Sequence, residues 1–305
     1  DVIWEPGLEY SRDKDKSSFA RVRAAAAKAD AAIVFVGEEA ILSGEAHSLS
    51  DLCLQGSQSE LLRAVHESGK PVVAVVMAGR PLTIERDLAN CDAMLYAFHP
   101  GTMGGPALAD LISGKASPSG KLPMTMLRDA GQAPFYYNHN NTGRPCNGTE
   151  TLLADIPVGA GQTSLGCTSY YLDTGYGPLF PFGYGLSYAS FSYGKPELES
   201  FSLERDGILR ASVRLENTGD MTATEVVQLY VQDIVGSVVR PVKELRRFER
   251  VTLAPGESRA VGFELPVSEL AFWNAEMEHV VEPGDFRLWI AGDSASGEPV
   301  VFTVR

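Results

Sequence analysis

The residues with the clearest capacity for chemistry are the carboxylates between Gly37 and Asp51. This segment holds Glu38, Glu39 and Glu45, and it directly follows a continuous apolar run. Carboxyl groups are candidates for general acid–base work because a protein can adjust their pKa values to the reaction. The pattern alone favours a solvated acidic loop, and the acid–base role stays open as the alternative.

The surrounding sequence predicts where this segment lies in the fold. Apolar runs at 31–36, 71–77 and 93–97 alternate with segments of helical spacing. Those helical segments are 17–29, 57–69, 82–88 and 105–113. Apolar strands that alternate with helices indicate a mostly parallel sheet covered on both faces. Ligands bind such sheets at the carboxyl ends of the strands, where Gly37, Arg80 and His99 are expected.

The C-terminal part of the chain has a different period. After Ser187 apolar and polar residues alternate, as at 209–215 and 225–231, and turn signals separate the runs. Short alternating strands of this kind predict an all-β sandwich. The intervening residues 129–187 show no periodicity, which is typical of a functional segment or one docked on a neighbour. The expected organisation is therefore an α/β domain at 1–128, an irregular linker at 129–187 and a β-sandwich at 188–305.

Composition excludes several classes of protein. The 305 residues carry a formal net charge of −13, which argues against nucleic acid and anionic membranes as partners. No apolar run approaches the roughly 20 residues that span a bilayer. No Cys or His cluster has metal-ligand spacing and no glycine loop has a phosphate-binding motif, so no metal and no cofactor is expected. Residues 1–10 lack a signal-peptide pattern, which leaves the compartment open.

The four cysteines fall into two pairs by context. Cys53 and Cys91 lie in apolar stretches, where buried free thiols are expected. Cys146 and Cys167 flank a polar segment rich in Gly and Thr. A disulfide between these two is one prediction and free thiols are the other, and a disulfide would imply an oxidising compartment.

Three stretches resemble the C-terminal half of glycoside hydrolase family 3, the β-glucosidase and β-xylosidase family. They are GKLPMT at 120–125 with the segment 131–145, PLFPFGYGLSY at 178–188, and the sandwich segments 242–251, 253–258 and 281–286. The resemblance implies a barrel, an α/β sandwich domain and a fibronectin type III-like (immunoglobulin-like) domain, of which this chain holds the last two. Other implied properties are a retaining, exo-acting β-glucosidase activity on terminal β-D-glucosyl residues and a periplasmic or secreted location.

The resemblance also assigns roles to residues. The family's nucleophile is a barrel aspartate in a motif that this chain lacks, and its acid/base corresponds to Glu45. Glu38 and Asp51 become substrate-binding candidates, with Glu38 or Glu39 the runner-up acid. Gly44 departs from the family pattern, because related loops often place a histidine before the glutamate.

The expected partners are a glycoside or oligosaccharide substrate and the barrel, as a domain or separate subunit, and a homodimer is compatible with the family. The rival readings are a β-xylosidase or other family 3 exo-glycosidase, and a non-catalytic carbohydrate-binding or structural module.

Overall fold

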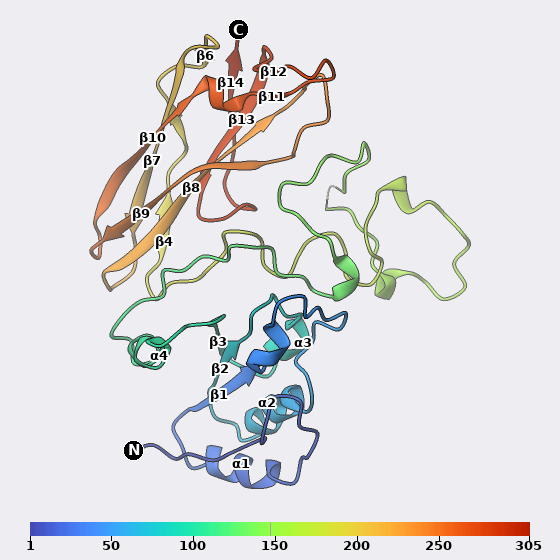
Figure 1. Ribbon diagram of the computed structural model, residues 1–305, viewed down its shortest axis with the longest axis vertical. Coiled ribbons are helices and arrows are strands. Elements are labelled where there is room, and N and C mark those ends of the chain that lie inside the picture. Colours follow the sequence, from blue (N-terminus) through green and yellow to red (C-terminus); the bar gives the residue numbers. More distant parts are fainter. Residues whose placement is uncertain (147) are drawn as a thin grey trace. The chain divides into compact units, whose positions relative to one another are not determined.

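The computed structural model describes residues 1–146 and 148–305, and the chain divides into two compact units (Figure 1). Unit 1 comprises Asp1–Leu108 with Met126–Pro134, and unit 2 comprises Ala109–Thr125 with Phe135–Arg305. The chain therefore passes into unit 2, returns to unit 1 and enters unit 2 again.

Unit 1 is built on a parallel sheet with the strand order β1-β2-β3. The strands are β1 (Ala32–Gly37), β2 (Val72–Met77) and β3 (Ala93–Tyr96). The helices are α1 (Phe19–Ala26), α2 (Gln58–His66) and α3 (Glu85–Leu88), followed by α4 (Gly104–Ile112). The valine-rich runs form strands because β-branched side chains pack well on a pleated surface. The predicted alternation of helices and parallel strands is confirmed.

The sheet is less completely covered than the sequence predicts. Val34 and Val36 of β1 are buried, and α2 packs against this strand. Ile33 and Phe35 point to the opposite face, because successive side chains of a strand alternate, and they are 46% and 57% exposed. The prediction of a sheet covered on both faces is therefore wrong at the β1 edge, within the residues described. Residues 1–4, whose composition resembles a strand, form none, and Val2 is exposed.

A buried carboxylate on α3 supplies a stability prediction. Asp87 is fully buried, and neither carboxylate oxygen has a hydrogen-bond partner in the part of the chain that the structure describes. Burial raises the pKa of Asp87, and the nearby Ser59 hydroxyl and Arg86 only partly oppose it. The pKa of Asp87 is therefore higher in the folded state than in the unfolded state. Its contribution to the stability of the folded state is complete at a pH below the unfolded-state pKa, and it is lost as the pH rises through the folded-state pKa.

Asp87→Asn is therefore expected to raise the free energy of unfolding by about 1 kcal/mol at pH 8, because it removes a buried charge. The gain should shrink towards pH 4, as the native carboxyl takes up a proton. Urea unfolding of both proteins at the two pH values measures this difference. An equal change at both values would contradict the explanation by charge.

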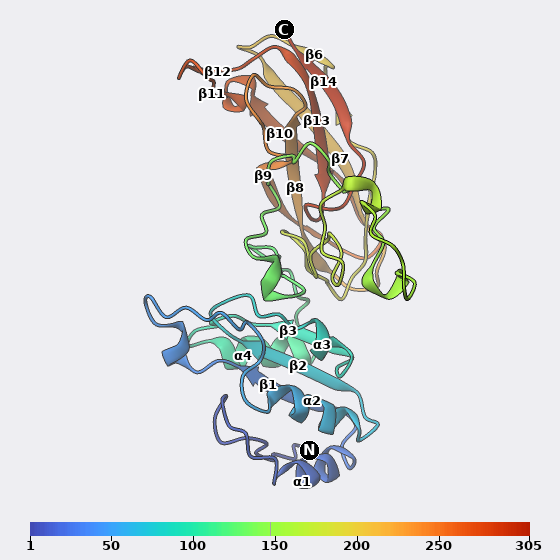
Figure 2. The same ribbon diagram turned by 90° about the vertical axis from the view of Figure 1, so that its right-hand side faces the viewer.

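Unit 2 contains a β-sandwich of two sheets. One has the order β10-β7-β4 with β5 also paired to β7, and the other has the order β6-β14-β13-β8-β9 (Figure 2). The strands are β4 (Phe191–Tyr193), β5 (Glu197–Leu198), β6 (Ser202–Leu203), β7 (Ile208–Asn217), β8 (Ala223–Asp233), β9 (Glu244–Leu253), β10 (Ser258–Pro266), β13 (Gly284–Ala291) and β14 (Val300–Val304). A separate hairpin joins β11 (Phe272–Trp273) and β12 (His279–Val280).

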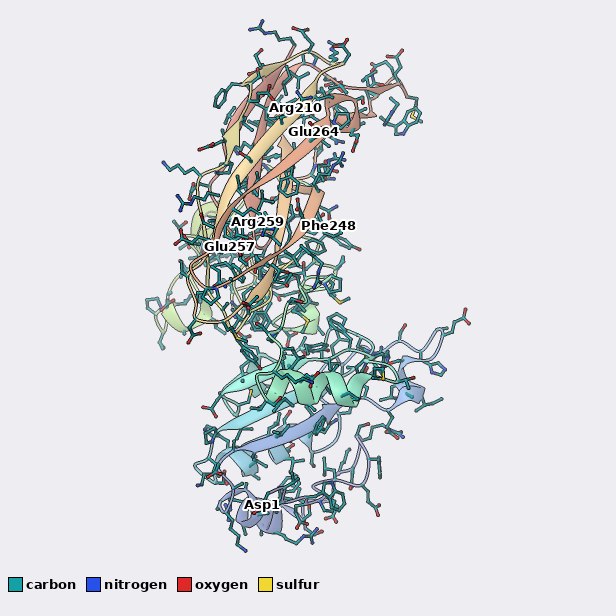
Figure 3. All side chains as sticks on the ribbon, turned by 90° about the vertical axis from the view of Figure 1, so that its left-hand side faces the viewer. Asp1, Arg210, Phe248, Glu257, Arg259 and Glu264 are labelled. Atoms are coloured by element: carbon teal, nitrogen blue, oxygen red, sulfur yellow. The ribbon has the colours of Figure 1, made fainter. Side chains whose placement is uncertain are left out.

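The sandwich core follows from the alternation in sequence. Every second residue of β7 is buried, including Leu209, Val213 and Leu215, and these join one core cluster with Val227 and Leu229 of β8. The intervening positions face outward and carry charges, such as the cross-strand pair Arg210–Glu264 on β7 and β10 (Figure 3). The predicted all-β sandwich is confirmed.

Within unit 2, part of the irregular segment packs against the outer face of the five-stranded sheet. The ring of Tyr137 stacks on Phe182 at 4.3 Å and lies edge-on to Tyr230 of β8 at 6.0 Å. The Tyr137 hydroxyl accepts a hydrogen bond from the Leu245 amide of β9 at 3.2 Å. The short 3₁₀ turns η3 (Leu153–Asp155) and η4 (Leu165–Cys167) lie in the same segment. Aromatic contacts thus take the place of regular secondary structure here.

Of the two alternatives for Cys146 and Cys167, the structure has the one without a disulfide between them. The Cys146 thiol donates a hydrogen bond to Glu150 Oε1 at 2.7 Å, and Cys167 is exposed in a left-handed conformation at φ 59°. Cys146 therefore has a carboxylate partner in this structure. Cys53 and Cys91 are free as predicted, although only half-buried.

Candidate active site on the β1 loop

The loop from Gly37 to Asp51 begins where β1 meets β2 most closely. Gly37 has φ +141°, and a Cβ atom there would lie 1.9 Å from the Met77 carbonyl oxygen. The next amide, of Glu38, donates to that same oxygen at 2.8 Å. Only glycine allows the two strand ends to approach in this way, so β1 ends here and the chain turns into the loop.

A buried glutamine fixes this turn. Gln58, the first residue of α2, is 3% exposed, and its Oε1 accepts from the Gly37 amide at 2.7 Å. Its Nε2 donates to the carbonyls of Gly37 at 2.9 Å and Ser11 at 2.8 Å. Because β1 is an edge strand, the Gln58 side chain supplies the backbone hydrogen bonds that a second neighbouring strand would give to Gly37. Sequence reasoning missed this residue, and its only signal is a polar side chain on the otherwise apolar buried face of α2.

Glu38 faces inward and pairs with an arginine. The Arg80 Nε lies 3.1 Å from Glu38 Oε2, and the two side chains are 16% and 1% exposed. The second oxygen of Glu38 has no hydrogen-bond partner among residues 1–146 and 148–305. The Glu38 carboxylate thus has almost no exposed surface in this chain and is paired with Arg80. Its predicted substrate contact stays a prediction.

Glu39 is held at the surface by the N-terminal segment. Its Oε2 accepts hydrogen bonds from Arg12 Nε at 2.7 Å and from the Ser11 hydroxyl at 2.9 Å. The hydrogen bond from Arg12 lowers the pKa of Glu39 below its ordinary value. A carboxylate kept ionised in this way is a poor proton donor, which weakens its case as the runner-up acid.

Glu45 lies beyond the turn η1 (Ala40–Ser43), at the start of an exposed stretch of the loop. A tight turn presents it: the His47 amide donates to the Gly44 carbonyl at 3.0 Å, and Ala46 has φ +62°. The His47 ring closes the turn by donating from Nδ1 to the Ile41 carbonyl at 2.6 Å. Glu45 is exposed, and its carboxylate has no hydrogen-bond or ion-pair partner in the described parts of the chain. It is therefore available to a group from outside this chain.

Asp51 closes the loop. Its Oδ1 accepts the Cys53 amide at 2.9 Å, and this bond lowers the pKa of Asp51. The residue is exposed, so a further contact through its carboxylate is sterically open. Glu38, Glu45 and Asp51 share one loop, but no hydrogen bond or ion pair joins them within the described residues. Their common feature is that they lie in the loop that follows the carboxyl end of β1.

No group of three or more His, Cys, Asp or Glu residues, among those that the structure describes, could hold a metal ion. Likewise, none of the helices in 1–146 and 148–305 is sufficiently long and apolar to traverse a bilayer.

The sequence matches two family models. Residues 7–188 match the glycosyl hydrolase family 3 C-terminal domain, and residues 225–294 match the fibronectin type III-like domain. The chain belongs to glycosyl hydrolase family 3. The family 3 domain contains the whole loop from Gly37 to Asp51, together with the strands that position it.

Relatives with known names agree with this family. A periplasmic beta-glucosidase of Salmonella typhimurium is 42% identical over 89% of this chain, which corresponds to 34% of that protein. A beta-xylosidase of Formosa agariphila is 39% identical over 95% of this chain and 38% of its own length. The crystal structure of a beta-glucosidase from Listeria innocua with glucose superposes with a TM-score of 0.86 at 37% identity, covering 95% of this chain and 38% of that one. This family 3 chain thus spans little more than a third of the proteins it resembles.

Proposed function

We propose that this chain supplies the acid/base residue, Glu45, to a retaining, exo-acting β-glucosidase. The observation that carries the proposal is an exposed, unpartnered carboxylate on the β1 loop of a family 3 domain. A retaining glycosidase needs two carboxyl groups about 5–5.5 Å apart, one a nucleophile and one an acid/base. The nucleophile would be an aspartate on a barrel, for which the relatives' additional length leaves room.

The chemistry divides between the two carboxyl groups. Glu45 would donate its proton to the glycosidic oxygen as the aspartate attacks the anomeric carbon, and would then deprotonate the water that releases the sugar. A proton-donating carboxyl group needs an apolar or anionic neighbour in order to hold its proton. An exposed loop acquires such neighbours when the rest of the enzyme and the substrate cover it. Asp51 stays the substrate-binding candidate at the loop's end.

The remaining assignments are part of the same proposal. The Salmonella relative's name supports a periplasmic or secreted location. We keep 1–128, 129–187 and 188–305 as the functional division, with the sandwich bracing the α/β domain. The homodimer stays a prediction. The Formosa relative supports a β-xylosidase as the second candidate.

A substrate panel separates these candidates. We expect the longest natural polypeptide containing this chain to hydrolyse p-nitrophenyl β-D-glucoside with a kcat/KM about tenfold above that for the β-D-xyloside, since one pocket group is worth a factor of that order. A preference for the xyloside would replace the glucosidase by the xylosidase. Failure of a folded protein to cleave either one would favour the non-catalytic module.

A further inference from the structure

Arg80 makes a set of contacts that brackets Glu45. Its Nη2 donates to the carbonyl of Leu42 and, at 3.2 Å, to the carbonyl of His47. These two carbonyls lie on either side of Glu45 in the loop. One guanidinium group, placed at the carboxyl end of β2, therefore holds both arms of the turn that presents the carboxylate.

Arg80 is itself fixed at two points, its guanidinium and its backbone carbonyl. Its Nε donates to the buried Glu38 carboxylate, which sets the plane of the group. The Arg80 backbone carbonyl accepts from the Tyr96 hydroxyl of β3 at 2.5 Å, and that hydroxyl accepts from the Leu82 amide at 2.9 Å. Burial raises the pKa of Tyr96 to about 12, so this link stays intact throughout the pH range of a working enzyme.

The loop also packs tightly on the strand end that carries Arg80. A Cβ atom at Gly79 would lie 2.5 Å from the Ser43 hydroxyl and 2.6 Å from His99 Nε2. The ends of β2 and β3 and the η1 turn therefore converge where Arg80 leaves the sheet. The resulting support for the loop comes from rigid strands, which hold a functional group better than a free loop does.

We propose that Arg80, anchored by Glu38, is a positioning residue for the acid/base loop. The inference rests on the proposed function of Glu45. Arg80 does not react; it holds Leu42 and His47 so that the carboxylate between them keeps one placement. A displacement of about 1 Å in a catalytic group can cost on the order of 100-fold in rate.

The test compares Arg80→Gln with Arg80→Lys in the polypeptide that contains the barrel. Protonation matters for poor leaving groups and little for good ones. We expect Arg80→Gln to lower kcat/KM on cellobiose by about 10- to 100-fold and on an aryl glucoside with an activated leaving group by less than about threefold. Lysine cannot reproduce the planar fork of arginine, so Arg80→Lys should recover only part of the loss.

Arg23→Gln is the matched control, because Arg23 also pairs with a glutamate, Glu67, but at the surface of unit 1. It should leave both substrates unaffected. An equal loss on both substrates in Arg80→Gln would overturn the inference in favour of a general fold defect or a direct substrate contact. No loss on either substrate would overturn it as well.

A second measurement needs no activity. Amide hydrogen exchange of the chain should accelerate by about tenfold over residues 40–47 in Arg80→Gln and stay unchanged over β2, because local opening exposes only the loop. Unchanged exchange over 40–47 would contradict a positioning role. Glu45→Gln separates the two proposals. If the loss in Glu45→Gln does not depend on the leaving group, the acid/base role proposed for Glu45 is wrong. If that loss depends on the leaving group and the loss in Arg80→Gln does not, only the positioning role of Arg80 is wrong.

Discussion

Glu45→Gln, in the polypeptide that carries the barrel, is expected to lower kcat/KM on cellobiose by about 10²–10⁴-fold, the usual contribution of a general acid. Glutamine keeps the size and shape of the side chain but has no proton to donate to the leaving oxygen. Since Glu45 is exposed and unpartnered among the described residues, the change should not alter the fold. Initial rates with cellobiose measure the effect directly.

Substrates with different leaving groups give this prediction its specificity. An aryl glucoside whose phenol leaves without protonation should lose far less in the first step, so the ratio of the two losses identifies the missing proton donor. A generally damaged enzyme would lose both activities equally. Retention of full cellobiose hydrolysis by Glu45→Gln would remove the acid/base assignment.

Glu39→Gln is the matched control for the same loop. Glu39 undergoes the same chemical change, but its pKa is lowered by Arg12, so it has little proton to donate at neutral pH. We expect a change of less than about threefold on either substrate, the size of a surface substitution's effect. If this variant instead showed the leaving-group signature, the runner-up would become the acid.

The position of the loop from Gly37 to Asp51 could be predicted from sequence because it depends on local patterns. The apolar run before Gly37 predicts a buried strand, and parallel sheets bind ligands where such strands end. The supports of the loop could not be predicted, because they come from distant positions. Arg80 and Gln58 reach the loop from the next strand and helix, and nothing in the intervening sequence specifies which carbonyls they contact.

The inward orientation of Glu38 was unpredictable for the same reason. Neighbouring glutamates in sequence, Glu38 and Glu39, differ because one meets a buried arginine and the other a surface arginine. The choice between a disulfide and unbridged thiols at Cys146 and Cys167 stayed open for a related reason, since spacing allows a bridge but cannot show that Glu150 takes the Cys146 thiol's hydrogen bond. The sequence pattern of this protein predicts its secondary structure, but it does not predict which partners its side chains contact.

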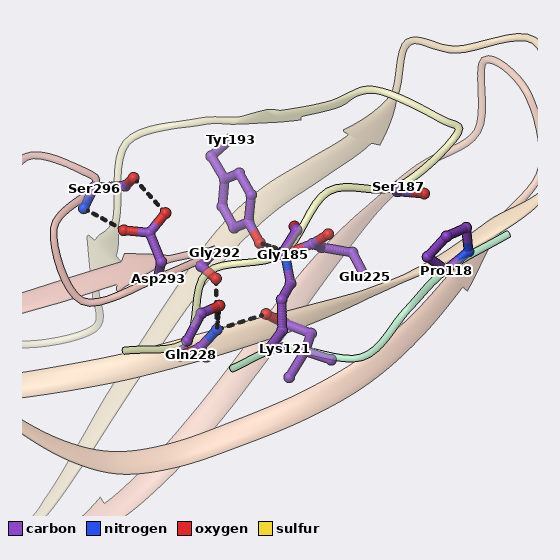
Figure 4. A network of polar contacts seen from close by, with 12 residues as sticks. Pro118, Lys121, Gly185, Ser187, Tyr193, Glu225, Gln228, Gly292, Asp293 and Ser296 are labelled. Carbon is purple, nitrogen blue, oxygen red and sulfur yellow. Dashed lines mark hydrogen bonds and ion pairs between the residues drawn. The ribbon is translucent and has the colours of Figure 1, made fainter. Parts of the chain in front are cut away.

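Two of the stretches that carry the family resemblance meet at a buried ion pair in unit 2 (Figure 4). Lys121, from the first stretch, lies 2.9 Å from Glu225 of β8, with exposures of 14% and 6%. Its Nζ also donates to the carbonyl of Gly185, in the second stretch, at 2.8 Å. The Tyr193 hydroxyl donates to Glu225 at 3.1 Å, and burial raises the pKa of Tyr193, which keeps it a donor. These motifs therefore specify a structural junction.

Lys121→Met is expected to lower the free energy of unfolding by about 3–5 kcal/mol, because it leaves the Glu225 carboxylate buried without its cation. The double variant Lys121→Met, Glu225→Leu should recover most of that loss, since a buried pair gains little over an apolar replacement of similar volume. Urea unfolding, followed by tryptophan fluorescence, measures the wild type, the two single variants Lys121→Met and Glu225→Leu, and the double variant. The non-additivity of the two changes gives the strength of the coupling.

Arg210→Met provides the matched control on the same sandwich. Its partner Glu264 is 65% exposed, so water compensates the carboxylate and the expected loss is below about 1 kcal/mol. A Lys121→Met loss no greater than this would show that the ion pair between Lys121 and Glu225 contributes little to stability. A large loss that the double variant fails to recover would instead point to Gly185. Lys121 would then stabilise the fold through its hydrogen bond to the Gly185 carbonyl and not through its charge on Glu225.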